Sequence, residues 1–326
     1  MNVFITRIIS PEGKQLLQQA GISFTEWTEK RELTQDELIS FCKNYDALIS
    51  VGQDKIDKKF LNECLHLKVI AQMAVGFDNI DIPEATKLKI PIGNTPGVLS
   101  AATADIAFLL MLAVSRKAFF QYKSISKGTW GYYEPTANLG IELHGKTLGI
   151  FGLGKIGFEM ALRCYHAYNM KIIYCNRSAN AFAEEKLEAK KVSFEELLAQ
   201  SDVLSVHTAL TPETKGSFDI NVFKQMKKTS IFINTARGGI HNETDLLTAL
   251  NEGMIWGAGL DVTNPEPMSP DNPLLNMPNV AILPHIGSAT EETRNAMSRL
   301  AAENVIAFYR NEKLPHIVNP EIYKLL

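Results

Sequence analysis

Short apolar runs alternate with amphipathic segments along nearly the whole chain, and no other feature of the sequence limits the fold more. Parallel strands joined by crossover helices produce this alternation, so the pattern predicts an α/β fold. The length of 326 residues exceeds that of a typical single domain. We therefore expect two domains, each built on a parallel sheet.

The predicted strands fall into two series. The first series ends near Pro91 and comprises Asn2 to Ile5, Ala47 to Val51 and Lys68 to Gln72. A single long helix is predicted over Ser100 to Lys123. The second series is longer and more regular, and comprises Thr147 to Gly152, Lys171 to Cys175, Val203 to Val206, Ile231 to Asn234, Gly257 to Leu260 and Val280 to Leu283.

The chain after the second series predicts one more helix. Ser288-Ala289-Thr290-Glu291 has the form of a capping box, which would open a helix that runs to about Tyr309. The tail beyond it is too short to form a domain, so we expect this helix to pack on the first section. The expected domains are then a discontinuous one, residues 1–99 plus 288–326, and a contiguous one, residues 100–287.

Charge and composition narrow the class of partner. A formal net charge of −3 gives no basic surface for nucleic acid or an anionic membrane, so a small-molecule partner is expected. The longest apolar stretch, residues 101–114, is shorter than the roughly 20 residues that a membrane helix needs. No signal-peptide pattern precedes the first strand, and the four cysteines show no CxxC pairing. We expect a cytoplasmic protein with reduced core thiols and no metal site.

A glycine-rich turn opens the second series. It reads Gly-Leu-Gly-Lys-Ile-Gly, follows an apolar strand and begins an amphipathic helix, as in a dinucleotide-binding βαβ unit. Gly152 would permit the tight turn, Gly154 the approach of the backbone to a pyrophosphate, and Gly157 the packing of helix on strand. The amides of Lys155 and Ile156 would face the phosphates. The alternative is a glycine turn that binds no ligand.

The end of the next strand predicts which dinucleotide is bound. The sequence Tyr174-Cys175-Asn176-Arg177-Ser178 contains no acidic residue to bind the ribose 2′-hydroxyl of NAD. Arg177 can clamp a 2′-phosphate, and Asn176 and Ser178 can donate to it. The sequence therefore predicts NADP(H) in preference to NAD(H), the alternative being that Arg177 is a solvated surface charge.

Three residues with side chains suited to anion binding and proton transfer follow predicted strands. Hydride transfer to a carbonyl beside a carboxylate would need a cation for the carboxylate, an acid for the carbonyl oxygen and a group that orients this acid. Arg237, Glu266 and His285 each follow a different strand of the second series, and carboxyl ends of parallel strands meet at one edge of a sheet. Each alone is more often a salt-bridge partner, but the joint placement favours a catalytic site.

These motifs carry a resemblance to a known family. The segments Gly152 to Gly157, Asn234 to Gly239, Asp261 to Pro267 and Pro284 to Ser288 resemble those of the D-isomer-specific 2-hydroxyacid dehydrogenases, in particular the glyoxylate, hydroxypyruvate and 2-ketogluconate reductases. Met73 to Asp81 is similar to the substrate loop of that family. The resemblance implies two Rossmann-like or flavodoxin-like domains with a cleft between them.

The resemblance also implies roles for individual residues. His285 would be the general acid, Glu266 would hydrogen-bond its far ring nitrogen, and Arg237 would bind the substrate carboxylate. The backbone amides of Val75 and Gly76 would donate to the substrate carboxylate. Asp261 would hold the nicotinamide side of the cofactor, and Thr235 and Ala236 would line the cofactor pocket. Members of the family are usually homodimers.

Two other functions fit the same fold. One is an NAD(P)-sensing protein similar to a transcriptional corepressor, which the joint presence of arginine, glutamate and histidine disfavours. The other is an NAD enzyme similar to phosphoglycerate dehydrogenase, which the missing acidic residue disfavours.

Among the other histidines, His207 ends a strand where the family has a loop that lines the cofactor. We expect the remaining histidines to be structural: His66, His144, His166, His241 and His316.

Overall fold

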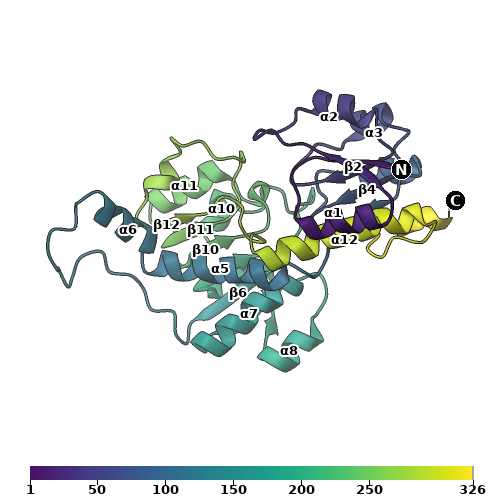
Figure 1. The fold of residues 1–326 in the computed structure, drawn as a ribbon. Coiled ribbons are helices and arrows are strands. Elements are labelled where there is room, and N and C mark those ends of the chain that lie inside the picture. Colours follow the sequence, from purple (N-terminus) through teal and green to yellow (C-terminus); the bar gives the residue numbers. More distant parts are fainter. Residues whose placement is uncertain (325–326) are drawn as a thin grey trace. The chain divides into compact units, whose positions relative to one another are not determined.

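The computed structural model describes residues 1–324 and divides into two compact units (Figure 1). One unit contains residues 1–99 together with the chain from residue 288 onward, and the other contains residues 100–287. Both are built on all-parallel sheets flanked by helices, which confirms the predicted α/β class with two parallel-sheet domains.

The first unit has a five-stranded sheet in the order β2-β1-β3-β4-β5. Its strands are β1 (Asn2–Ile5), β2 (Ser23–Glu26), β3 (Ala47–Ser50), β4 (Val69–Gln72) and β5 (Ile92–Gly93). Its helices are α1 (Pro11–Gln19), α2 (Gln35–Cys42), α3 (Lys58–Glu63), α4 (Ile82–Lys87) and α12 (Glu291–Tyr309). The last helix packs on α1 and on the sheet at β4, so the chain returns to this unit at its end (Figure 1).

The second unit has a seven-stranded sheet in the order β12-β11-β10-β9-β6-β7-β8. Its strands are β6 (Thr147–Phe151), β7 (Lys171–Cys175), β8 (Lys190–Lys191), β9 (Val203–Val206), β10 (Ile231–Asn234), β11 (Gly257–Leu260) and β12 (Val280–Ile282). Its α-helices are α5 (Ser100–Ser115), α6 (Ala118–Ser126), α7 (Lys155–Tyr168), α8 (Ala181–Leu187), α9 (Phe194–Gln200), α10 (Ile220–Phe223) and α11 (Glu243–Asn251). Two short 3₁₀ turns complete it, η1 (Gly238–Ile240) and η2 (Pro273–Asn276).

Both faces of the seven-stranded sheet are buried, as a parallel sheet requires. Along β10, Ile231 and Ile233 belong to a core with α5 and α7, whereas Phe232 belongs to a second core with α9 and α11. Strands of this kind read as continuous apolar runs, which is why the sequence predicted the second series closely. No helix of the part that the structure describes is long and apolar enough to cross a membrane.

Three strands were not predicted. The strand β2 lies at the edge of its sheet and its residues are alternately exposed and half-buried, so it has no continuous apolar run. The strands β5 and β8 have two residues each, which is too short for a recognisable period. All three are short pieces at a sheet edge.

The prediction of one helix over Ser100 to Lys123 is wrong. The helix ends at Ser115, and a new one begins after Lys117, whose backbone is left-handed with φ 53°. The carbonyl of Ser115 accepts a hydrogen bond from the amide of Ile141 at 2.9 Å. A contact with a residue far along the chain therefore accompanies the break, and the local sequence contains no signal for it.

The start of the last helix is also corrected. Thr290, not Ser288, is the N-cap, because its side chain accepts from the amide of Thr293 at 3.1 Å. The helix begins at Glu291 and ends at Tyr309, as expected. Serine and threonine are both good N-caps, so the sequence could place the first residue of the helix only to within a few residues.

Candidate active site

The three candidate catalytic residues leave neighbouring strands of the second unit at the same edge of the sheet. Arg237 follows β10, Glu266 follows β11, and His285 follows β12, and these strands are adjacent in the order β12-β11-β10. In Figure 1 their labels lie side by side beneath α11. Ligands of open α/β sheets bind at this carboxyl edge.

The imidazole of His285 and the carboxylate of Glu266 are hydrogen-bonded. Nδ1 of the ring donates to Oε1, and both side chains are about one third exposed. The bond places the ring proton on Nδ1 when His285 is neutral, so Nε2 is the nitrogen that can take up or release a proton. An acid oriented by a carboxylate is therefore present at the sheet edge, with its second nitrogen unused by Glu266.

His285 has a left-handed backbone with φ 53°, which is uncommon for a residue with a side chain. The carboxylate of Asp261 stabilises this conformation by binding the two backbone amides that follow His285. Its Oδ1 accepts from the amide of Ile286 at 2.8 Å, and its Oδ2 accepts from the amide of Gly287 at 2.7 Å. Burial raises the pKa of the Asp261 carboxyl, while these two amides lower it. Asp261 therefore fixes the turn that presents His285, a role that the sequence did not predict.

The loop that carries Glu266 is held by residues around it. Glu243, at the start of α11, accepts from the amide of Asn264 at 3.1 Å and from Nδ2 of Asn272 at 2.6 Å. Within the loop, Oγ1 of Thr263 donates to the carbonyl of Pro265 at 2.8 Å. These bonds hold the backbone just before Glu266, and the bond to the side chain of Asn272 ties the later part of the loop to the same carboxylate of Glu243.

The loop that carries Arg237 begins at Asn234, which is fully buried. The side chain of Asn234 bonds to the backbone of both Ala236 and Arg237, each at 2.9 Å. Nη1 of Arg237 donates to the carbonyl of Ala236 at 2.8 Å. Oγ1 of Thr235 is buried and has no hydrogen-bond partner in residues 1–324. A buried hydroxyl without a partner is what a ligand in this loop could satisfy.

The glycine turn has the geometry that a phosphate site requires. Gly152 has φ 97°, and a Cβ there would lie 2.7 Å from the amide nitrogen of Thr208. A Cβ at Gly157 would lie 2.8 Å from the carbonyl of Gly152, so helix and strand could not pack as they do. At Gly154, by contrast, a Cβ would meet nothing within 4 Å. This glycine leaves open space at the N-terminus of α7, where the amides of Lys155 and Ile156 belong to the first turn and have no acceptor within the helix.

Asn176 contributes to this turn in a way that the sequence did not indicate. Its Oδ1 accepts from the amide of Leu153 at 2.6 Å, and its Nδ2 donates to the carbonyl of Leu153 at 3.2 Å. Asn180 donates to the same carbonyl at 3.1 Å. The amide of Asn176 therefore holds the glycine turn, whereas the side chains of Arg177 and Ser178 are exposed at the end of β7.

The remaining predicted residues, Val75 and Gly76, belong to the first unit. They follow β4 and are half-buried. Nδ2 of Asn94 donates to the carbonyl of Val75 at 2.9 Å, and the amide of Thr95 donates to the carbonyl of Ala74 at 3.0 Å. These contacts fix the carbonyl side of the segment.

His207 lies next to the glycine turn. Its amide donates to the carbonyl of Phe151 at 2.8 Å, and its ring is hydrogen-bonded to Oγ of Ser205 at 2.8 Å. Burial lowers the pKa of the ring. His207 therefore stays neutral near pH 7, and its backbone amide holds Phe151, the residue directly before the glycine turn.

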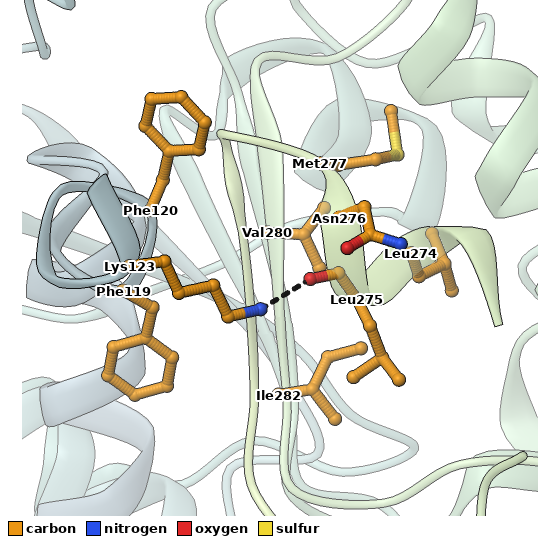
Figure 2. A pocket seen from close by; sticks show the side chains of 9 residues that line it. All are labelled: Phe119, Phe120, Lys123, Leu274, Leu275, Asn276, Met277, Val280 and Ile282. Atoms are coloured by element: carbon orange, nitrogen blue, oxygen red, sulfur yellow. Dashed lines mark hydrogen bonds between the residues drawn. The ribbon is translucent and has the colours of Figure 1, made fainter. Parts of the chain in front are cut away.

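A small pocket of the same unit contains none of these residues. It lies between α6 and the η2 turn, and its apolar walls include Phe119, Leu274 and Ile282 (Figure 2). Its volume is about 110 Å³. Nζ of Lys123 donates to the carbonyl of Leu275 at 2.6 Å across it. This hydrogen bond and the apolar contacts hold α6 against the η2 turn, and none of the candidate site residues lines the pocket.

Residues 1–324 contain no cluster of His, Cys, Asp and Glu that could hold a metal ion.

A glycine turn at a helix N-terminus, together with an oriented imidazole and an arginine at neighbouring strand ends, defines a dinucleotide-dependent oxidoreductase. Residues 108–287 match the model of a family described as D-isomer specific 2-hydroxyacid dehydrogenase, NAD binding domain. The chain belongs to this family and is an NAD(P)-dependent oxidoreductase that acts on a small 2-keto or 2-hydroxy acid.

Known proteins resemble the chain over nearly its full length. It is 42% identical to a glyoxylate reductase from Aeropyrum pernix over 99% of this chain and 97% of the relative. It superposes on the TT0316 protein from Thermus thermophilus with a TM-score of 0.90 and 37% identity, covering 98% and 100% of the two chains. An NADPH-dependent glyoxylate/hydroxypyruvate reductase from Sinorhizobium meliloti, solved with NADP and malonate, gives a TM-score of 0.84 and 29% identity over 98% and 97%.

Proposed function

We propose that the protein is an NADP(H)-dependent reductase that converts a small 2-keto acid of the glyoxylate, hydroxypyruvate or 2-ketogluconate type to the D-2-hydroxy acid. The observation that carries the proposal is the hydrogen bond between His285 and Glu266 at the strand ends beside the Arg237 loop. The names of the Aeropyrum and Sinorhizobium relatives support the same substrate class.

The residues present fit a nicotinamide dinucleotide. The open space at Gly154 and the first amides of α7 suit a pyrophosphate. The hydroxyl of Thr235, which has no hydrogen-bond partner among residues 1–324, suits a polar group of the ligand. The residues that we expect to hold the cofactor lie along one sheet edge: Gly152, Gly154, Lys155, Ile156, Gly157, Arg177, Ser178, Thr235, Ala236 and Asp261. Asn176 contributes indirectly, because its side chain holds the glycine turn through Leu153. When bound, the reduced nicotinamide supplies the hydride.

The residues of the chain supply the remaining steps. The guanidinium of Arg237 binds the substrate carboxylate and polarises the ketone, aided by the amides of Val75 and Gly76. Nε2 of His285 gives a proton to the ketone oxygen, and in the reverse direction it accepts the proton of the alcohol. Glu266 keeps Nδ1 protonated and stabilises the positive charge that the ring holds before it donates.

The preference for NADP(H) rests on Arg177. Its side chain is exposed at the end of β7, and its carbonyl accepts from Nζ of Lys191 at 3.3 Å, so a second cation lies nearby. Arg177→Ala is expected to raise the KM for NADPH at least about tenfold, because a charge-assisted pair with the 2′-phosphate is lost, and to leave the KM for NADH unchanged. Lys171→Ala, at the opposite end of the same strand, is the matched control. Equal effects on both cofactors would refute the assignment.

The substrate is tested with a panel of 2-keto acids. NADPH oxidation is followed with glyoxylate, hydroxypyruvate, 2-ketogluconate and pyruvate, and kcat/KM is compared among them and with NADH as cofactor. We expect at least one of the first three to exceed pyruvate. The D configuration of the product is checked with hydroxypyruvate and 2-ketogluconate by oxidation with an enantiospecific dehydrogenase, because the glycolate formed from glyoxylate has no stereocentre. A kcat/KM with each of the first three acids that does not exceed the value for pyruvate would contradict the proposal, and so would no turnover at all.

We further propose a homodimer that forms through the segment around residues 118–142. Exposed large hydrophobic side chains gather there, namely Tyr122, Ile125, Trp130, Tyr132, Tyr133 and Leu139. The segment also surrounds a hollow of about 560 Å³. An exposed apolar patch of this kind is typical of an interface. Sedimentation of the wild type and of a Trp130→Ala, Tyr133→Ala double variant tests it, and a wild type that stays monomeric at micromolar concentration would contradict it.

The cysteines bear on the expected cytoplasmic location. All four are free thiols in the structure, and Cys42, Cys64 and Cys164 are buried. Free buried thiols are typical of proteins that work in a reducing compartment. We therefore propose that the enzyme works in the cytoplasm, and fractionation with an antibody against the protein tests this.

A further inference from the structure

The conformation of the Arg237 loop depends on one buried amide. Oδ1 of Asn234 accepts from the amide of Ala236 at 2.9 Å, and Nδ2 donates to the carbonyl of Arg237 at 2.9 Å. The second hydrogen of Nδ2 points to Nδ1 of His241, 3.0 Å away. Asn234 is fully buried, so its whole side-chain amide is used inside the protein.

These contacts fix the protonation state of His241. A reversed amide would set Oδ1 against the carbonyl of Arg237 and Nδ2 against the amide of Ala236, and both contacts would be repulsive. Nδ2 therefore faces His241 with a hydrogen, and Nδ1 of the ring must accept it. It follows that the ring is neutral and carries its proton on Nε2.

The surroundings of His241 keep it neutral but do not fully satisfy it. The ring is 1% exposed and packs edge-on against Phe232 at a centroid distance of 5.8 Å. Burial lowers the pKa of His241 to about 4. Nε2 has no hydrogen-bond partner in the described part of the chain. A leucine in this apolar place would leave no buried N–H without a partner, so burial alone does not account for a histidine at this position. The hydrogen bond that Nδ1 accepts from Asn234 does account for it.

We propose that His241 is a positioning residue for Arg237: its Nδ1 lone pair holds the amide of Asn234, which in turn fixes the backbone that presents the guanidinium. The proposal rests on the proposed function, in which Arg237 binds the substrate carboxylate. His241 acts through Asn234 and makes no contact with the substrate in this scheme. Misplacement of a bidentate group by a fraction of an ångström weakens both binding and turnover, so a defect here is measurable.

Two substitutions of His241 test the acceptor. His241→Leu removes it, whereas the side-chain oxygen of His241→Gln can still accept from Asn234. We expect His241→Leu to raise the KM for the 2-keto acid about fivefold and to lower kcat, the size expected when one neutral hydrogen bond is lost. The Kd for NADPH should change less than the KM for the 2-keto acid, because the glycine turn is untouched and, of the expected cofactor residues, only Thr235 and Ala236 lie in the Arg237 loop. His241→Gln should return the KM to within about twofold of the wild type.

A control separates positioning from stability. Phe223→Leu alters the core around Phe232, because Phe223 and His241 both pack on the ring of Phe232. Among the described residues, Phe223 has no side-chain hydrogen bond to Asn234. Lower stability alone reduces the fraction of active enzyme, so it lowers the apparent kcat and leaves KM unchanged, which is the result expected for Phe223→Leu. An unchanged KM in His241→Leu, an equal rise in Phe223→Leu, or no rescue by glutamine would each overturn the proposal.

Arg237→Lys separates this proposal from the function on which it rests. Normal kinetics in Arg237→Lys would remove the proposed role of the guanidinium and the positioning role with it. An impaired Arg237→Lys together with a normal KM in His241→Leu would leave the proposed function intact and overturn the role of His241 alone.

Discussion

Substitution of Gly154 by alanine should weaken the binding of NADPH far more than it destabilises the fold. The backbone at Gly154 has φ −90° and ψ −157°, which alanine adopts readily, and its Cβ would meet no protein atom within 4 Å. The expected cost to folding is the loss of a favourable N-cap, about 0.5–1 kcal/mol. For a unit of this size, that lowers Tm by about 1–4 °C.

The cost to binding follows from the same geometry. A methyl group at Gly154 would occupy the space through which a pyrophosphate reaches the amides of α7, so about one charge-assisted hydrogen bond, worth about 2 kcal/mol, is lost. This raises Kd about 30-fold. At an NADPH concentration 100 times the wild-type Kd, the cofactor stabilises the wild type by about 2.7 kcal/mol and the variant by about 0.9 kcal/mol. The rise in Tm on adding NADPH should therefore shrink to about a third.

The assay is thermal unfolding with and without NADPH, supported by fluorescence titration. Gly152→Ala serves as the contrast, because its φ of 97° and the contact with Thr208 make alanine strained even without cofactor. We expect Gly152→Ala to lower Tm in the absence of NADPH, whereas Gly154→Ala loses chiefly the response to NADPH. A full NADPH response in Gly154→Ala would refute the assignment of this turn to the pyrophosphate.

Other predictions concern the catalytic residues and pH. His285→Ala is expected to lower kcat by about 100-fold or more while the Kd for NADPH stays within twofold, as for loss of a general acid; near-normal turnover would exclude the role. Glu266→Gln should lower kcat with little change in KM, because a neutral amide cannot stabilise the protonated ring, and an unchanged kcat would show that Glu266 does not act through His285. Arg237→Lys should raise KM and lower kcat together, and a change in Tm alone would make Arg237 structural. Burial lowers the pKa of His241 from 6.5 to about 4, so the unfolded chain takes up this proton first as pH falls. The stability linked to His241 is complete above pH 6.5 and is lost toward pH 4, by about 3 kcal/mol at about 1.4 kcal/mol per pH unit. Urea unfolding at pH 7 and pH 4.5 should show a smaller loss for His241→Gln than for the wild type, and equal losses would contradict the linkage.

The central strands and the strand-end residues could be predicted because both depend on patterns within a few residues. A buried parallel strand such as β10 is a continuous apolar run. Arg237 and His285 lie three residues after the ends of their strands, and Glu266 lies six residues after β11. The order of the strands then brings the three residues to one edge. Their roles in the reaction stay predictions until the kinetic tests are made.

The features that could not be predicted depend on contacts between distant residues. The left-handed backbone at His285 is held by the carboxylate of Asp261, 25 and 26 residues away from the amides it binds. The break before Lys117 is accompanied by a bond from Ile141 to Ser115. Asn176 was expected to face a phosphate, yet most of its side-chain amide is taken by the backbone of Leu153. No local pattern encodes such partners.

The return of the last helix to the first unit affects how the chain can mature during synthesis. Residues 100–287 form a unit that is complete once they have left the ribosome. The helix α12, which belongs to the first unit, is synthesised only after them. The first unit emerges earlier but lacks α12, so the surfaces of α1 and β4 stay uncovered until translation passes residue 309. We therefore expect the middle of the chain to become protease-resistant before its beginning does, and ribosome-stalled chains that end before α12 to keep an accessible N-terminal section.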